Sequence, residues 1–211
     1  MEKNFWLDRW QTNQIGFHLP EAHPLLVKHS QFLSLKEGDR IFLPLCGKTL
    51  DIHWFLAQGI DVVGAELAET AIIQLFKELD VEPDITISGK LKLYSAPHID
   101  IFVGDIFDLD KKSIGHVDAL YDRAALVALP QEMRERYVQH LKEIAPCFNE
   151  LLISFEYDPS QYSGPPFYVG HEEIKSYYPK SNLLESRVVE GGLQGIYPAK
   201  ECAWHISLIP H

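Results

Sequence analysis

The stretch RIFLPLCGKTLDIHWFLAQGIDVVGAE, residues 40–66, decides the fold class. Two apolar runs rich in β-branched residues, 40–45 and 61–66, predict strands. A segment of helical length, 50–59, lies between them. Because neither run alternates with polar residues, we expect both faces of each strand to be buried. A strand–helix–strand unit of this kind predicts a parallel sheet with helices on both sides.

The same stretch contains Gly47-Lys48-Thr49, which resembles the end of a phosphate-binding P-loop. A P-loop also has a glycine five positions before the second one, which frees the backbone to curl around phosphate oxygens. Phe42 occupies that position here. The stretch therefore does not predict a nucleotide triphosphate site, and we expect Lys48 to face solvent or to cap a neighbouring group.

Patterns of the same kind recur along the rest of the chain. Further strands are predicted at 99–105, 117–122 and 151–157, and further helices at 68–80 and 130–145. Pro130 stands where the first-turn proline of the last helix belongs.

The two ends of the chain have a different pattern. Residues 1–35 predict an aromatic-rich helical cover, and residues 182–192 and 201–210 predict a closing antiparallel pair of strands. The loosely patterned residues 81–98 are assigned no element. Since no repeat or linker interrupts the pattern, we expect a single domain over residues 1–211.

Composition favours a globular protein with a small-molecule ligand. The chain has 211 residues, of which 46% are apolar and 23% are charged, and this suits one folded domain. Its formal charge of −11 repels phosphate backbones and anionic lipid heads. We therefore expect neither nucleic acid nor membrane as a partner, and a monomer is the default for a compact domain.

The sequence also predicts a cytoplasmic location without a metal site. The start MEKNFWLDRW has no basic and apolar signal pattern, and the longest apolar runs are too short to span a membrane. Cys46, Cys147 and Cys202 lie far apart, which favours reduced, buried thiols over disulfides or zinc ligands. The ten histidines form no metal-ligand motif.

In an open parallel sheet, ligands bind beyond the carboxyl ends of the strands, where the strand order reverses. This rule selects Leu45 after the first predicted strand and Glu66 at the tip of the second. A carboxylate at Glu66 can accept both ribose hydroxyls of an adenosine, although it could equally be a solvated group beside a helix N-cap. The third strand ends at Asp105 and Ile106, where a base is usually held; alternatively, Asp105 caps a short turn.

The fourth strand ends at Asp122 and Arg123. A guanidinium there can bind a ligand carboxylate in bidentate fashion, but an ion pair with Asp122 or Glu66 is the alternative. The chain has no glycine-rich turn for the pyrophosphate of a dinucleotide. An adenosine that carries an amino-acid tail and no phosphate is S-adenosyl-L-methionine, which is therefore the favoured ligand.

Several motifs together carry a resemblance to a known family. They are FWLDRWQTNQIGFH (5–18), FLPLCGKTLDIHWFLAQGIDVVGAEL (42–67), GDIFDL (104–109), YDRAALVALP (121–130) and SFEYDPSQYSGPPFYVGHEEI (154–174). With them the chain resembles the thiopurine S-methyltransferases, in particular their bacterial branch. The resemblance implies a three-layer, Rossmann-like class I methyltransferase fold. In that α/β fold a mostly parallel central sheet carries an antiparallel C-terminal strand and an N-terminal helical cover.

The resemblance also implies roles for single residues. The residues implied to bind S-adenosyl-L-methionine are Trp10, Leu45, Glu66, Asp105, Ile106 and Arg123. Phe17 is implied to lie on the acceptor side, together with Arg123. Animal members have an arginine shortly before the last strand that is implicated in substrate contact. Only Lys200 is available there in this chain, so the acceptor pocket is expected to differ.

The activity that the resemblance implies is methyl transfer from S-adenosyl-L-methionine to the sulfur of thiopurines and small aromatic thiols, with selenium and tellurium compounds as further acceptors. An acidic heteroaromatic thiol reacts largely as the thiolate or thione, so no general acid or base is assigned. Arg123 is the candidate for an electrostatic role on the acceptor side. The alternatives are an NAD(P)-dependent reductase and a non-catalytic nucleoside-binding protein.

Overall fold

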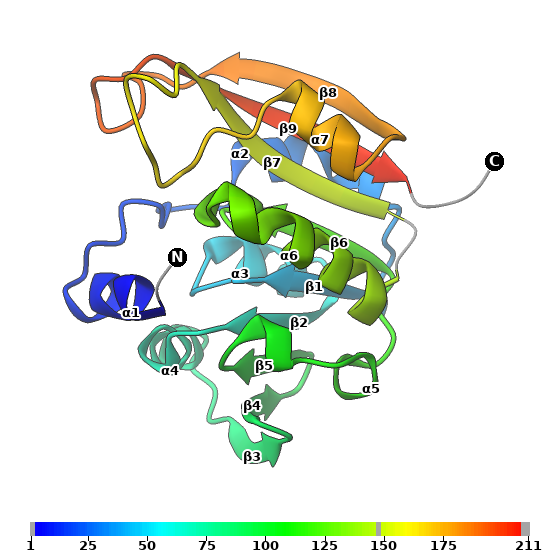
Figure 1. The fold of residues 1–211 in the computed structure, drawn as a ribbon. Coiled ribbons are helices and arrows are strands. Elements are labelled where there is room, and N and C mark those ends of the chain that lie inside the picture. Colours follow the sequence, from blue (N-terminus) through cyan, green and yellow to red (C-terminus); the bar gives the residue numbers. More distant parts are fainter. Residues whose placement is uncertain (1–2, 147–148, 208–211) are drawn as a thin grey trace.

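The computed structural model describes residues 3–146 and 149–207 (Figure 1). The strands are β1 (Arg40–Pro44), β2 (Asp61–Glu66), β3 (Asp84–Ser88), β4 (Leu91–Ala96), β5 (Ile99–Val103), β6 (Ala119–Arg123), β7 (Asn149–Tyr157), β8 (Ser181–Val188) and β9 (Ala199–Ser207). The helices are α1 (Lys3–Gln11), α2 (Pro24–His29), α3 (Leu50–Ala57), α4 (Glu69–Glu78), α5 (Lys111–Ile114), α6 (Gln131–Ile144) and α7 (His171–Tyr177). Short 3₁₀ turns are η1 (Ser30–Leu33), η2 (Ile106–Asp108) and η3 (Leu126–Ala128).

The strands of the described residues form one nine-stranded sheet in the order β3-β4-β5-β2-β1-β6-β7-β9-β8. The pairs β1–β2, β2–β5, β1–β6 and β6–β7 are parallel, which confirms the prediction from residues 40–66. From β1 the chain builds outward through β2 and β5 on one side and later through β6 and β7 on the other. The strand order therefore reverses between β1 and β6, and the crevice beyond their carboxyl ends is where a ligand is expected.

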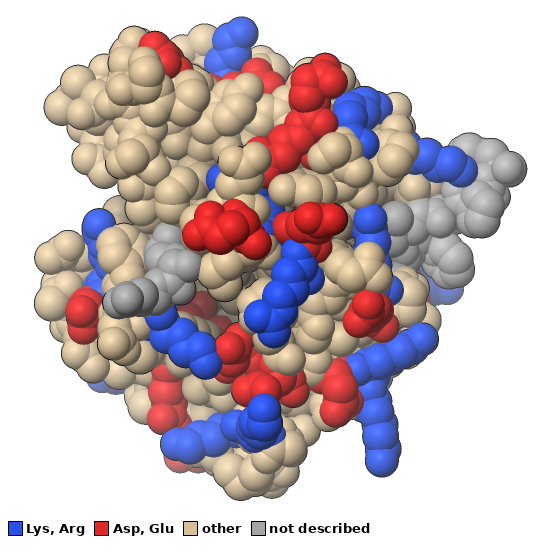
Figure 2. Space-filling model, in the orientation of Figure 1, with Lys and Arg blue, Asp and Glu red and all other residues tan. Residues whose placement is uncertain are grey.

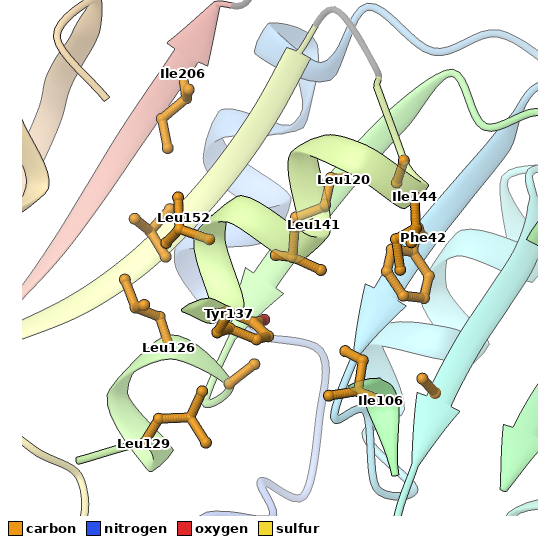
Figure 3. Packing of buried hydrophobic residues seen from close by; sticks show 14 of the residues in the cluster. Phe42, Ile106, Leu120, Leu126, Leu129, Tyr137, Leu141, Ile144, Leu152 and Ile206 are labelled. Carbon is orange, nitrogen blue, oxygen red and sulfur yellow. The ribbon is translucent and has the colours of Figure 1, made fainter. Parts of the chain in front are cut away.

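Strand β1 is buried on both faces, as its unbroken apolar pattern predicts. Phe42 packs into a core with α5, α6 and α7, whereas Ile41 and Leu43 pack into a second core with α2, α3 and α4. Figure 3 shows the first of these cores, in which strand residues such as Phe42 and Leu152 face α6. Helices thus cover both faces of the sheet, and the fold has three layers (Figure 1).

The predicted ends of the chain are confirmed. Strands β8 and β9 pair antiparallel, and β9 also runs antiparallel to β7, so the last strand runs against the parallel strands of the centre, as predicted. The N-terminal segment is helical in α1 and α2. In Figure 1, α1 lies beside α4 at the carboxyl ends of the strands.

Residues 81–98, which were assigned no element, contain the hairpin β3–β4. Gly89 closes it at φ +61°, and β4 pairs antiparallel with β5, so the hairpin extends the sheet at one edge. The short helices α5 and α7 were also not predicted. Pro130 is the N-cap of α6 and not its first helical residue.

The thiols behave as the cysteine spacing predicts where the structure describes them. Cys46 and Cys202 are both free and buried. Cys147 lies outside the described residues.

Candidate active site at the carboxyl ends of the strands

The tip of β1 turns sharply toward β2. Leu45 and Gly47 both adopt left-handed backbone conformations, at φ +48° and +53°. The amide of Cys46 between them donates to the Ala65 carbonyl on β2 at 3.0 Å. A side chain at position 47 would meet Trp10, because a Cβ atom there would lie 2.7 Å from Cζ2 of the indole. Glycine is therefore required by both the backbone angle and the covering ring.

Glu66, at the tip of β2, ties this turn to the start of α4. Its Oε2 accepts a hydrogen bond from the Gly47 amide at 2.7 Å, and its Oε1 accepts one from the Ala68 amide at 2.8 Å. The side chain is buried, and burial raises the pKa of the carboxyl, while the backbone amides of Ala68, Gly47 and Leu67 oppose that rise. The alternative expected from the sequence, a solvated carboxylate beside a helix N-cap, is therefore wrong, because Glu66 is buried. Glu66 does accept a hydrogen bond from Ala68, the N-cap residue of α4.

The N-terminal segment supplies aromatic rings and a backbone acceptor to the same crevice. Trp10 is buried against Ala68 and Ala71, and its ring meets that of Phe17 edge-on at 5.6 Å between centroids. The ring of Trp6 also meets that of Phe17 edge-on, at 5.7 Å between centroids.

Arg123 connects β6 to this segment. Its Nη2 donates to the Phe17 carbonyl at 2.8 Å. Asp122 and Glu66 bond to other groups, and within residues 3–146 and 149–207 no ion pair joins Arg123 to either of them. The structural ion pair considered from the sequence is thus wrong for the described residues, and Phe17 and Arg123 are brought together as the acceptor-side prediction requires.

Asp105 and Ile106 lie at the other end of the crevice. Asp105 caps η2 by accepting from the Phe107 amide at 3.1 Å, and it also pairs with Lys3 of α1 at 2.8 Å. Burial raises the pKa of this carboxyl, but Lys3 and the Phe107 amide outweigh burial, so the net shift is downward. The side chain of Ile106 packs into the core below α6 (Figure 3), and its carbonyl accepts from His140 at 2.8 Å.

A cavity of about 390 Å³ opens beside these residues, between α1, the start of α4 and the hairpin β3–β4. Its lining residues are Leu7, Gln11, Leu67, Glu69, Thr70, Lys90, Lys92 and Val103. None of the six predicted donor-binding residues lines it, but Leu67 directly follows Glu66. Figure 2 shows a second hollow on the same face, between the α1 region and the lobe formed by the loops that follow β7 and β8.

Sequence reasoning considered Asp122 only as a partner for Arg123, and the structure gives it a different environment. Asp122 is buried, its Oδ1 accepts from the Leu126 amide at 2.9 Å, and its Oδ2 accepts from the Tyr137 hydroxyl at 2.8 Å. Burial raises the pKa of Asp122 to about 6. The sequence shows only a carboxylate next to Arg123 at the end of a predicted strand, and neither its burial nor its partners can be read from that.

Two remaining side chains near the β1 tip, those of Lys48 and Cys46, have structural roles. Lys48 does not face solvent, because its side chain is only 12% exposed; it pairs with Glu78 of α4, in line with the second expectation, that it caps a neighbouring group. Burial raises the pKa of the Cys46 thiol well above its ordinary value, which agrees with a packing role and not with a nucleophile. Among the described residues, no group of three or more histidine, cysteine or acidic side chains is arranged to hold a metal ion.

Comparison with solved structures supports the fold. A 1,6-didemethyltoxoflavin-N1-methyltransferase from Burkholderia thailandensis, solved with 1,6-didemethyltoxoflavin and S-adenosylhomocysteine, superposes with a TM-score of 0.66 at 14% identity, over 97% of this chain and 87% of that one. A SAM-dependent methyltransferase from Anabaena variabilis superposes with a TM-score of 0.58 at 16% identity, over 97% and 94%. These likenesses show the class I methyltransferase fold.

Comparison of sequences shows the family. The family model described as Thiopurine S-methyltransferase (TPMT) matches residues 1–193. The thiopurine S-methyltransferase of Gluconobacter oxydans is 44% identical over 98% of this chain and 95% of its own length. That of Xanthobacter autotrophicus is 48% identical over 97% and 98%. The chain therefore belongs to the thiopurine S-methyltransferase family and is an S-adenosyl-L-methionine-dependent S-methyltransferase.

Proposed function

We propose that this chain methylates the sulfur of thiopurines and small aromatic thiols, and that the donor lies in the crevice at the carboxyl ends of β1, β2, β5 and β6. The residues proposed to hold the donor are Trp10, Leu45, Glu66, Asp105, Ile106 and Arg123. The observation that carries the proposal is the position of Glu66, a buried carboxylate at the tip of β2 that is bonded to the turn after β1. S-adenosyl-L-methionine supplies an activated methyl group on a sulfonium.

The polar groups around Glu66 fit the adenosine part of S-adenosyl-L-methionine. In Glu66, Oε2 accepts from the Gly47 amide and Oε1 from the Ala68 amide, and a carboxylate has about four lone-pair sites, so acceptor capacity is left for the ribose hydroxyls. At the other end, the guanidinium of Arg123 can bind a carboxylate. The ring of Trp10 over Gly47 offers an aromatic face to a cationic sulfur. Asp105 is proposed to accept from the adenine amine, which requires it to share or release Lys3.

On the acceptor side, Phe17 and Arg123 act together. The ring of Phe17 supplies an apolar surface for a flat heterocycle. The positive charge of Arg123 favours the thiolate form of an acidic thiol, so the chain need not provide a general base. Its main contribution to the reaction is then orientation of the two reactants in a crevice with little water. Selenium and tellurium compounds, which are also soft nucleophiles, are proposed as further acceptors.

The catalytic unit is proposed to be one domain that works as a monomer in the cytoplasm and does not bind nucleic acid. The single sheet and the formal charge of −11 support this view. No helix in the described part of the chain is long and apolar enough to cross a membrane. The comparisons lend no support to the reductase or to the non-catalytic nucleoside-binding protein considered from the sequence.

Titration calorimetry with S-adenosylhomocysteine tests the donor site. We expect Glu66→Ala to weaken binding by roughly 1–3 kcal/mol, because two ligand hydroxyls lose their acceptor. Glu78→Ala is the matched control, since it removes an acidic side chain of α4 that pairs with Lys48 outside the proposed site. Equal affinity of Glu66→Ala and wild type would disprove the role of Glu66. Release of S-adenosylhomocysteine with a mercaptopurine, measured in parallel, tests turnover.

A further inference from the structure

Asp122 is the last residue before Arg123 on β6, and it is almost completely buried, with 1% of its surface exposed. Both of its carboxylate oxygens are occupied inside the protein. Oδ1 accepts from the Leu126 amide at 2.9 Å, and Oδ2 accepts from the Tyr137 hydroxyl at 2.8 Å. A buried carboxylate costs free energy unless such bonds compensate it. Its place directly behind the crevice therefore calls for an explanation.

The hydrogen bond to Leu126 closes a turn that contains Arg123. Between the two bonded residues the chain passes through Ala124, a non-glycine residue at φ +60°. A left-handed alanine is unfavourable by about 1 kcal/mol or more, so this turn needs an external hold. Asp122 supplies that hold from within β6. Arg123 leaves the turn and donates to the Phe17 carbonyl at 2.8 Å.

Tyr137 fixes the orientation of the carboxylate. Its ring is fully buried on α6, next to Leu126 and Leu129 of the segment after β6 (Figure 3). Glu150 on β7 is the other buried acidic group on this side, and burial together with the charge of Asp122 raises the pKa of Glu150. Within the described residues, no hydrogen bond joins the Glu150 side chain to the turn after β6, which makes Glu150 a useful comparison for Asp122.

We propose that Asp122 is a positioning residue for methyl transfer. By bonding to the Leu126 amide and the Tyr137 hydroxyl, it holds the turn that presents Arg123 to the crevice. This inference rests on the role of Arg123 in the proposed function. Asp122 itself does not face the ligand, and it acts only through the placement of its neighbour.

A double-mutant cycle on the full chain tests this proposal. Asp122→Asn keeps the size of the side chain but replaces one acceptor oxygen with an amide donor. We expect it to lower kcat/KM for a mercaptopurine about tenfold, because small misplacements of a binding group are costly in catalysis. Arg123→Ala should lower it further. In the Arg123→Ala background, Asp122→Asn should change kcat/KM less than twofold, since its effect passes through Arg123.

A purely structural role of Asp122 predicts another result: the fold-losses of kcat/KM caused by the two single substitutions should multiply in the double variant. That outcome, or an unchanged kcat/KM in Asp122→Asn, would overturn the proposal. If Asp122→Asn does not fold, Tyr137→Phe replaces it in the test, because it leaves Asp122 in place and removes one of its hydrogen bonds. We expect Tyr137→Phe to cause a smaller loss of kcat/KM, and this loss should also disappear in the Arg123→Ala background. Glu150→Gln is the control and should not couple to Arg123→Ala. Failure of the proposed function would be seen separately, as a wild type without turnover.

Discussion

Replacing Gly47 with alanine probes the contact between the β1 tip and the N-terminal cover. Gly47 has φ +53°, where an alanine is unfavourable by about 1–2 kcal/mol. The new Cβ would also lie 2.7 Å from Cζ2 of Trp10, closer than real Cβ atoms come, and 3.2 Å from Cη2, which is a tight contact. Overpacking of this kind costs about 1–3 kcal/mol. We therefore expect Gly47→Ala to lower the free energy of unfolding by roughly 2–5 kcal/mol.

Gly89→Ala is a matched control for the backbone term. Gly89 has a similar φ of +61°, but a Cβ there would meet no heavy atom within 4 Å. Urea unfolding should therefore give Gly89→Ala the smaller loss, of about 1–2 kcal/mol. The additional loss of unfolding free energy in Gly47→Ala, relative to Gly89→Ala, measures the contact with Trp10. This difference should disappear when the two glycine substitutions are made in a Trp10→Ala background. Equal losses for the two glycines in the wild-type background would refute the packing of Trp10 on the β1 tip.

Two further predictions concern charged groups near the crevice. Lys48→Ala should change the affinity for S-adenosylhomocysteine less than twofold by calorimetry, and a tenfold loss of affinity would contradict the assignment of this stretch. It should cost about 1–2 kcal/mol of stability, because among the described residues Lys48 pairs with the partly exposed Glu78, while its own side chain is only 12% exposed and also loses packing. Burial raises the pKa of Asp122 from 3.8 to about 6, so between these pH values the native state holds a proton that the unfolded chain releases. As pH rises from 4 to 7, the free energy of unfolding of wild type should therefore fall by about 3 kcal/mol relative to that of Asp122→Asn. Chemical denaturation at a series of pH values measures this difference, and parallel pH profiles for the two proteins would count against the raised pKa of Asp122.

The central sheet could be predicted because its strands are buried on both faces. Unbroken apolar runs such as 40–45 have few other structures open to them, and the predicted strand at 61–66 matches β2 in full. The hairpin β3–β4 was missed for the opposite reason. In β3, Ile85 and Ile87 are 55% and 73% exposed, so the strand has no core-facing apolar pattern that would distinguish it from a loop.

The candidate site was predictable to the extent that it consists of side chains at strand tips. Glu66 and Arg123 follow from the rule that ligands lie beyond the carboxyl ends of a parallel sheet. The contact between Arg123 and Phe17 did not follow, because the acceptor is a backbone carbonyl 106 positions away and every residue type carries one. The pairing of Asp105 with Lys3 likewise depends on where α1 packs, which local sequence does not encode.

These backbone contacts have a common electrostatic consequence. Glu66 and Asp122 are both buried, yet each is satisfied by neutral donors, namely backbone amides and a tyrosine hydroxyl, and not by a cation. Arg123, which follows Asp122 at the end of β6, donates to a neutral carbonyl. Since no ion pair joins Arg123 to an acidic group among the described residues, its positive charge is not neutralised within the protein. In a chain with a formal charge of −11, this unpaired cation is the feature that supports the proposed role of Arg123 toward an anionic ligand group, whether the carboxylate of the donor or the thiolate of the acceptor.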